Sequence, residues 1–179
     1  MKFHDAAGLN EILKFLKAKN ILTIADEVMT GFGKTGSNFA SDLIETKPDI
    51  ICLSKALTGG LVPMAITSCT EEIYTAFLSN EMAKGFFHCH TYSANPIACA
   101  AANAAIELLQ TEEIQQSIKD IAALHKQFQE QIIKHPKVKS TRSLGVIFAL
   151  DLEVKIAGYG NLRDKLLPFF MGKGVFLRP

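Results

Sequence analysis

Two short apolar segments, each followed by a charged residue, constrain the fold of this chain more than any other feature. Residues 21–25 and 50–53 are too apolar for an alternating strand and too short for a helix, so we expect strands buried on both faces. Asp26 closes the first segment, and Lys55 comes two residues after the second. This pattern predicts two parallel strands within an α/β fold.

The two charged residues are expected at one site. Parallel strands of an open α/β sheet bring the residues after their carboxyl ends to a common edge, where such folds bind ligands. A buried lysine amine is costly unless its pKa falls or it is bound covalently, and imine formation achieves the latter. Taken singly, Asp26 is typical of a turn and Lys55 of a solvated surface, so the hypothesis depends on their combination.

The remaining segments predict flanking helices and a second, smaller unit. Apolar spacing predicts helices over residues 8–18, 71–78, 112–134 and 162–171, and another that begins at the Asn95-Pro96 pair. We expect further strands over residues 61–67, 146–152 and 175–177, and an extended backbone over residues 137–142. We therefore expect part of a large domain over residues 1–120 and the start of a smaller α+β domain over residues 121–179.

The net charge and the hydropathy of the chain indicate no macromolecular partner. A formal net charge of +1 gives no reason to expect nucleic acid or a membrane surface. No apolar run reaches the roughly 20 residues that span a bilayer, and the first ten residues lack the features of a signal peptide. We therefore expect a cytoplasmic chain whose substrates are small molecules.

The cysteine and histidine pattern gives little support to a metal site. The four cysteines form no C-x-x-C pair. His88-Cys89-His90 is the one cluster whose alternate side chains could point the same way, but zinc sites require three or four ligands. We expect a structural or cofactor-contact role for this cluster and no metal.

Five motifs in one order resemble the class III pyridoxal-phosphate-dependent aminotransferases of fold type I. They are residues 24–28 (IADEV), 31–36 (GFGKTG), 48–50 (PDI) and 54–60 (SKALTGG), followed by the Asn95-Pro96 pair. The resemblance implies a mostly parallel sheet with flanking helices, pyridoxal 5'-phosphate as the cofactor, and a homodimer. It covers nearly all of this chain, but members of the family are much longer, so the chain corresponds to part of an enzyme.

The same resemblance implies roles for three residues of the first and fourth motifs. Asp26 pairs with the pyridine nitrogen of the cofactor, which favours electron withdrawal from the reacting carbon. Val28 packs on one face of the ring. Lys55 forms the internal aldimine and, once released, moves the proton between the substrate carbon and the cofactor carbon.

Three further residues receive roles from the resemblance. The Thr91 hydroxyl donates to the cofactor phosphate of the partner subunit, helped by the backbone of His90. Arg178 holds the carboxylate of the keto substrate, a task that suits a planar guanidinium group. Purely structural roles remain open for Thr91 and Arg178. Cys89 stands where the family pattern has glycine.

Residues 88–92 (HCHTY), 98–104 (ACAAANA) and 177–179 (LRP) narrow the resemblance to a branch of the family that acts in biotin biosynthesis. That branch passes an amino group from a small-molecule donor to a keto acid. Two alternatives stay open. One is another class III aminotransferase of the ornithine or 4-aminobutyrate type, and the other is a noncatalytic folding or dimerisation module. We expect little turnover from the isolated chain.

Overall fold

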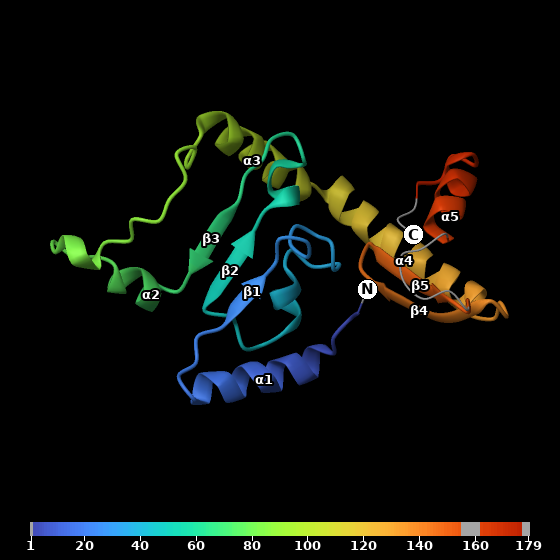
Figure 1. Ribbon diagram of the computed structural model, residues 1–179, viewed down its shortest axis with the longest axis horizontal. Coiled ribbons are helices and arrows are strands. Elements are labelled where there is room, and N and C mark those ends of the chain that lie inside the picture. The colour runs from blue at the N-terminus through green and yellow to red at the C-terminus, as the bar shows by residue number, and fades with distance from the viewer. Residues whose placement is uncertain (1, 155–161, 177–179) are drawn as a thin grey trace.

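A three-stranded sheet lies at the centre of the larger part of the molecule (Figure 1). The computed structural model describes residues 2–154 and 162–176. Strands β1 (Ile24–Asp26), β2 (Ile50–Leu53) and β3 (Ile66–Cys69) lie in the order β1-β2-β3. Strands β1 and β2 are parallel, whereas β2 and β3 are antiparallel. The predicted parallel pair and the α/β fold class are confirmed.

The third strand begins at Ile66 rather than at residue 61. Gly59 and Gly60 have φ angles of 62° and 84°, which turn the chain sharply after β2. Two side chains then hold the following segment away from strand pairing. The Thr58 hydroxyl donates to the carbonyl oxygen of Val62 at 2.6 Å, and Ser54 donates to that of Met64 at 2.7 Å.

Helices surround the sheet and lead away from it. The described α-helices are α1 (Ala6–Ala18), α2 (Glu71–Ala76), α3 (Pro96–Leu109), α4 (Glu112–Ile132) and α5 (Leu162–Met171), with short 3-10 helices η1 (Ala40–Leu43), η2 (Lys55–Thr58) and η3 (Met82–Lys84). The Asn95 side chain caps α3 by accepting hydrogen bonds from the backbone of Ile97 and Ala98, as its sequence position predicts. None of the described helices is long and apolar enough to cross a membrane.

A polar clamp fastens the amino-terminal ends of the two parallel strands. The Asp49 carboxylate accepts hydrogen bonds from the backbone N–H and the hydroxyl of the buried Thr23, at 2.8 and 2.7 Å. The carbonyl oxygen of Thr23 in turn accepts from the N–H groups of Asp49 and Ile50. The Thr23 hydrogen bonds hold the pKa of the Asp49 carboxyl below its usual range.

Replacing Asp49 with alanine should lower the free energy of unfolding by about 2 kcal/mol, because two donors of Thr23 lose a charged acceptor. Asp49→Asn keeps an oxygen in place and should cost less. Because the folded-state pKa is lowered, the charge stabilises the fold above the unfolded-state pKa near 3.8, and this contribution is lost as pH falls through the folded value. Urea denaturation at pH 7 and pH 3 measures both effects. An unchanged free energy of unfolding in Asp49→Ala would contradict a stabilising role of the hydrogen bonds between Asp49 and Thr23.

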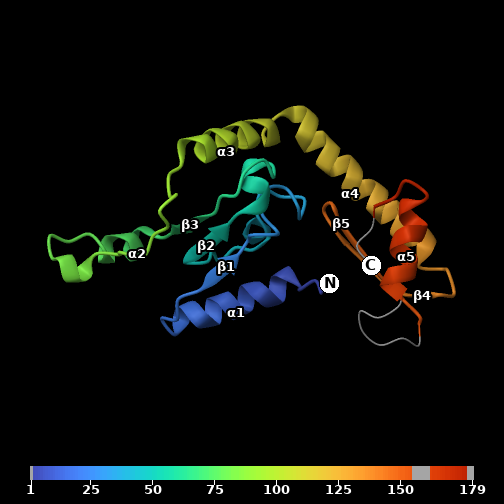
Figure 2. The ribbon, with the colours of Figure 1, turned by 45° about the horizontal axis from the view of Figure 1, so that its top comes forward.

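Helix α4 connects the sheet region to an antiparallel hairpin, as Figures 1 and 2 both show. The hairpin consists of β4 (Val138–Leu144) and β5 (Ile147–Leu152). Gln129 of α4 donates to the carbonyl oxygen of Thr141 at 3.3 Å and accepts from the hydroxyl of Ser143 at 2.7 Å. The division into two domains at residue 120, inside α4, stays a prediction.

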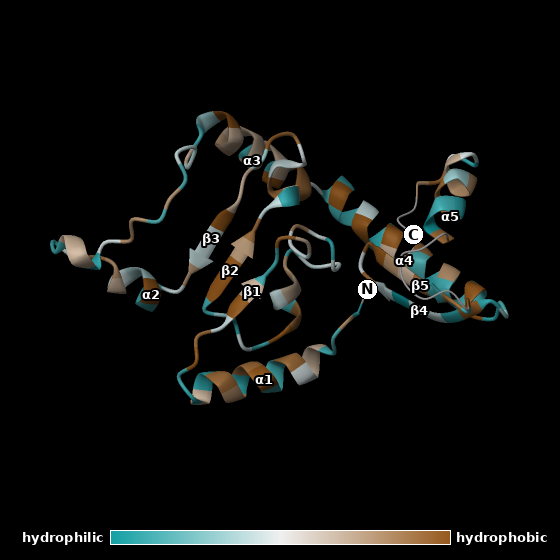
Figure 3. Cartoon of the chain, viewed as in Figure 1, coloured by the Kyte–Doolittle hydropathy of each residue, from teal (hydrophilic) through white to brown (hydrophobic). Residues whose placement is uncertain are grey.

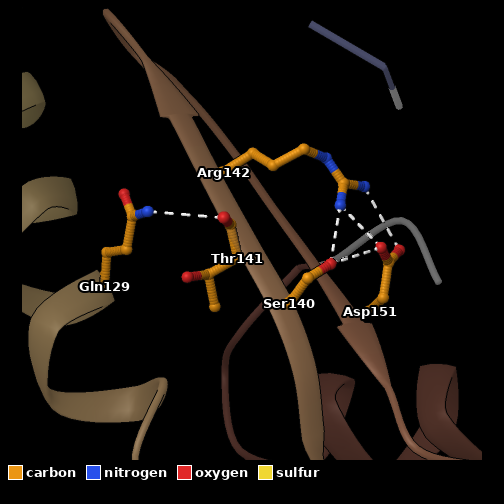
Figure 4. Close-up of polar contacts among 5 residues, drawn as sticks. All are labelled: Gln129, Ser140, Thr141, Arg142 and Asp151. Carbon is orange, nitrogen blue, oxygen red and sulfur yellow. Dashed lines mark hydrogen bonds and ion pairs between the residues drawn. The ribbon is translucent and has the colours of Figure 1, made fainter.

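An ion pair joins the two strands of the hairpin (Figure 4). The Arg142 guanidinium contacts both carboxylate oxygens of Asp151, at 2.6 and 3.2 Å, and Ser140 donates to the same carboxylate. These hydrogen bonds hold the pKa of the Asp151 carboxyl well below its usual range. The expected strand over residues 175–177 is not formed at residues 175 and 176, and Leu177 lies outside the described residues.

The core is small, and the expectation that residues 21–25 are buried on both faces is wrong. Leu22 and Ile24 are 65% and 66% exposed. Strand side chains point to the two faces of a sheet, and among the described elements β1 has extensive contacts with β2 alone, at the edge of the sheet. Figure 3 shows the apolar colour of these strands and of one stripe of α1. The chain exposes 13516 Å², whereas a compact protein of this mass exposes roughly 8,600 Å².

Candidate active site

The carboxyl edge of the parallel pair carries both predicted reactive residues. Asp26 is the last residue of β1 and lies opposite Cys52 of β2. Lys55 follows Cys52 by three residues, as the first residue of η2. Since neighbouring strands lie about 4.8 Å apart, the two Cα atoms are separated by a distance on the order of 10 Å. The two residues therefore meet at one edge of the sheet.

The backbone of Lys55 has an unusual conformation. Its φ angle is 50°, in the left-handed region, which costs a residue other than glycine roughly 1–2 kcal/mol. The next turn is rigid, because Leu57 and Thr58 are buried and η2 packs against α3. The Lys55 side chain is nevertheless exposed. Such strain at an exposed residue on a rigid support is typical of functional sites.

A pocket of about 730 Å³ opens beside Lys55. One wall comes from the loop after β1, with Val28, Met29 and Lys34. A second, apolar wall comes from residues 146–148 of the hairpin. The structure thus brings Lys55 and Val28 into one pocket.

Asp26 lies beside this pocket rather than in its lining. One oxygen of its carboxylate accepts a hydrogen bond from the backbone of Val28 at 3.1 Å. The other oxygen accepts none from the described residues, and the side chain is exposed. The carboxylate is therefore oriented by the chain while one of its oxygens stays available to a ligand.

His90 and Thr91 do not reach the pocket. Both are exposed in the segment between η3 and α3, which Figure 1 shows on the side of the sheet away from the hairpin. His90 accepts a hydrogen bond from the backbone of Tyr92 at 3.1 Å. No group of three or more potential metal ligands occurs within residues 2–154 and 162–176. Arg178 lies outside the described residues.

A buried carboxylate next to Asp26 is a feature that sequence reasoning missed. Glu27 is 2% exposed and accepts hydrogen bonds from the backbone of Ala40 and Ser41 at 2.7 Å each, and from the Thr30 hydroxyl at 2.8 Å. Burial raises the pKa of Glu27, but these hydrogen bonds outweigh it and lower the pKa overall. The one available sequence signal was an acidic residue between an apolar strand and a glycine-rich loop.

The hairpin reaches the pocket through a contact between backbones. The Val146 N–H donates to the carbonyl oxygen of Lys34 at 3.1 Å. A Cβ atom on Gly145 would lie 2.3 Å from the nitrogen of Gly36, so only glycine fits there. Sequence reasoning could not pair Gly36 with Gly145, because more than a hundred residues separate them.

Comparisons with known proteins agree on one family. The family model described as "Aminotransferase class-III" matches residues 1–179. The adenosylmethionine-8-amino-7-oxononanoate aminotransferase of Synechococcus elongatus is 43% identical over 96% of this chain and 40% of its own length. The enzyme of the same name from Helicobacter pylori is 35% identical, over 100% of this chain and 42% of its own length.

Solved structures give the same result for the fold. The adenosylmethionine-8-amino-7-oxononanoate aminotransferase of Methanocaldococcus jannaschii superposes with a TM-score of 0.84 at 33% identity, over 96% of this chain and 42% of that chain. An omega-transaminase from Thermomicrobium roseum also gives 0.84, at 28% identity. The chain spans about two-fifths of the length of the curated relatives named here.

Proposed function

We propose a transamination function on the premise that this chain belongs to the class III aminotransferase family, whose model matches all of its residues. The proposed reaction transfers the amino group of S-adenosylmethionine to 8-amino-7-oxononanoate and yields 7,8-diaminononanoate in biotin biosynthesis. The names of several relatives support this choice of substrates. The observation that carries the proposal is the exposed, strained Lys55 at the sheet edge that it shares with Asp26.

The residues at this edge fit pyridoxal 5'-phosphate. Its aldehyde needs an accessible amine, which Lys55 offers inside the pocket. Its pyridine nitrogen needs a carboxylate, and Asp26 has one oxygen that no described residue occupies. The flat apolar ring needs an apolar contact, and Val28 shares the pocket with Lys55. When bound, the cofactor supplies an electron sink for the carbon that loses its proton.

The residues around the pocket have separate roles in the proposed reaction. Lys55 would hold the cofactor through its amine, and the same amine, once free, would carry a proton from the substrate carbon to the cofactor carbon. Asp26 would hold the pyridine nitrogen of the cofactor in its protonated form. Residues 146–148 add apolar surface to the lining of the pocket beside Lys55.

Three assigned residues lie away from the pocket or outside the described residues. We propose that Thr91, with the backbone of His90, contacts the cofactor phosphate of a partner subunit in a cytoplasmic homodimer. Their exposure and their absence from the lining of the pocket beside Lys55 support a role toward another subunit. We propose that Arg178 binds the carboxylate of the keto acid.

Chemical trapping tests the central part of the proposal. After incubation with pyridoxal phosphate and reduction with borohydride, peptide mapping should find the label predominantly at Lys55. Lys34 lines the same pocket and Lys119 lies exposed on α4, so both serve as internal references. Labelling of these lysines to the same extent as Lys55 would favour the noncatalytic alternative.

A donor panel in the enzyme that contains this chain tests the substrates. S-adenosylmethionine should aminate 8-amino-7-oxononanoate, whereas ornithine and 4-aminobutyrate should not. Reaction with 4-aminobutyrate and none with S-adenosylmethionine would replace the biotin assignment by the other branch of the class.

A further inference from the structure

We infer that Glu27 is a positioning residue, whose buried carboxylate fixes the loop after β1 and thereby the pocket wall beside Lys55. The inference rests on the proposed function only in that this pocket is the one assigned to the cofactor. Glu27 itself does not line the pocket. It acts through Val28 and Met29, which follow it directly in the chain.

Glu27 fastens both ends of this loop. Its side chain accepts from Ala40 and Ser41, which lie 13 and 14 residues further along the chain. Its backbone N–H donates to the carbonyl oxygen of Cys52 at 3.0 Å, and its carbonyl oxygen accepts from Gly31 at 2.9 Å. One residue therefore joins the end of β2, the start of the loop and the start of η1.

The loop needs such a clamp because its own sequence gives it little rigidity. Gly33 and Gly36 have φ angles of 88° and 89°, and glycine loses more conformational freedom on folding than any other residue. The same loop carries Lys34, whose carbonyl oxygen receives the hydrogen bond from Val146 of the hairpin. Both walls of the pocket therefore depend on the position of this loop.

The geometry requires a charged acceptor at residue 27. Two backbone N–H groups and the Thr30 hydroxyl converge on two oxygens, and an ionised carboxylate offers acceptors alone. Within the described residues no lysine or arginine forms an ion pair with Glu27, so these dipoles supply its stabilisation. In Glu27→Gln, an NH2 group would face at least one N–H donor. The variant is close in size and changes the acceptor set alone.

The test compares labelling of Lys55 by pyridoxal phosphate in this chain and three variants. Glu27→Gln should reduce the labelling by at least about tenfold, the equivalent of one hydrogen bond to a charged group. Thr30→Val removes one donor and should give a smaller reduction, which keeps the test valid if Glu27→Gln does not fold. The matched control is Asp49→Ala, which breaks a similar clamp at the opposite ends of the same strands and should leave labelling of the folded fraction within about twofold.

Parent-like labelling of folded Glu27→Gln and Thr30→Val would overturn the inference, because Glu27 would then have a structural role alone. If the parent itself is not labelled, the proposed function fails, and amide hydrogen exchange decides about Glu27 separately. The amides of residues 28–41 should then exchange faster in Glu27→Gln than in the parent and in Asp49→Ala. Unchanged exchange in that loop would overturn the clamp itself.

Discussion

Replacing Lys55 with alanine is expected to abolish covalent attachment of pyridoxal phosphate and to reduce transamination by at least about 10²–10⁴-fold, the contribution of a positioned acid-base group. Alanine has no amine to bind the aldehyde or to carry the proton. Lys34 cannot substitute, because a different backbone segment holds it on the wall formed by the loop. The measurements are the visible absorbance of the bound cofactor and single-turnover amino transfer in the enzyme that contains this chain.

Two further variants separate this chemistry from folding. Lys119→Ala removes an exposed lysine from α4 and should leave absorbance and turnover unchanged. Lys55→Gly should lose activity to the same extent as Lys55→Ala. Its free energy of unfolding should be about 1 kcal/mol higher than that of Lys55→Ala, because glycine accepts a φ of 50° without strain. Activity that survives in Lys55→Ala would remove Lys55 from its role.

Replacing Gly145 with alanine is expected to lower the free energy of unfolding by about 3 kcal/mol, through overpacking and backbone strain together. The added Cβ would lie 2.3 Å from backbone atoms of Thr35 and Gly36 and 2.6 Å from the carbonyl oxygen of Lys34. These are backbone atoms, so no side chain can rotate away. The hairpin should move off the loop, the hydrogen bond of Val146 should break, and the pocket should lose its apolar wall. Urea denaturation and labelling of Lys55 measure the two consequences.

Gly174 provides the matched control for this substitution. Its φ angle of 73° is also in the left-handed region, but a Cβ atom there would meet nothing within 4 Å. Gly174→Ala should therefore cost only the strain, about 1 kcal/mol. If Gly145→Ala and Gly174→Ala lowered the free energy of unfolding by the same amount, the contact between the hairpin and the loop would not contribute to stability.

Local patterns were enough to predict the parallel pair and most helices. The two apolar segments, one ending at Asp26 and the other shortly before Lys55, predict strands by their short length and apolar composition. The Asn95 cap predicts the start of α3. The direction of β3 was not predictable, because a short apolar segment has the same composition in either direction. The expected burial of residues 21–25 failed because burial depends on what packs against a strand, and β1 has one described strand neighbour.

The site was predictable only in part, for a related reason. Lys55 and Asp26 follow strands, so topology alone places them at one edge. The clamp at Glu27 and the contact of Gly36 with Gly145 join residues far apart in the sequence, and no local pattern encodes such pairs. The roles assigned to Lys55, Asp26, Val28, His90, Thr91 and Arg178 all stay predictions.

The hairpin and the glycine-rich loop touch through main-chain atoms, at the hydrogen bond from Val146 to Lys34 and at the close approach of Gly145 to Gly36. Substitutions of the Val146 and Ile147 side chains would therefore change the surface that lines the pocket and leave this main-chain contact in place. The attachment of the hairpin and the shape of the pocket surface can thus vary separately.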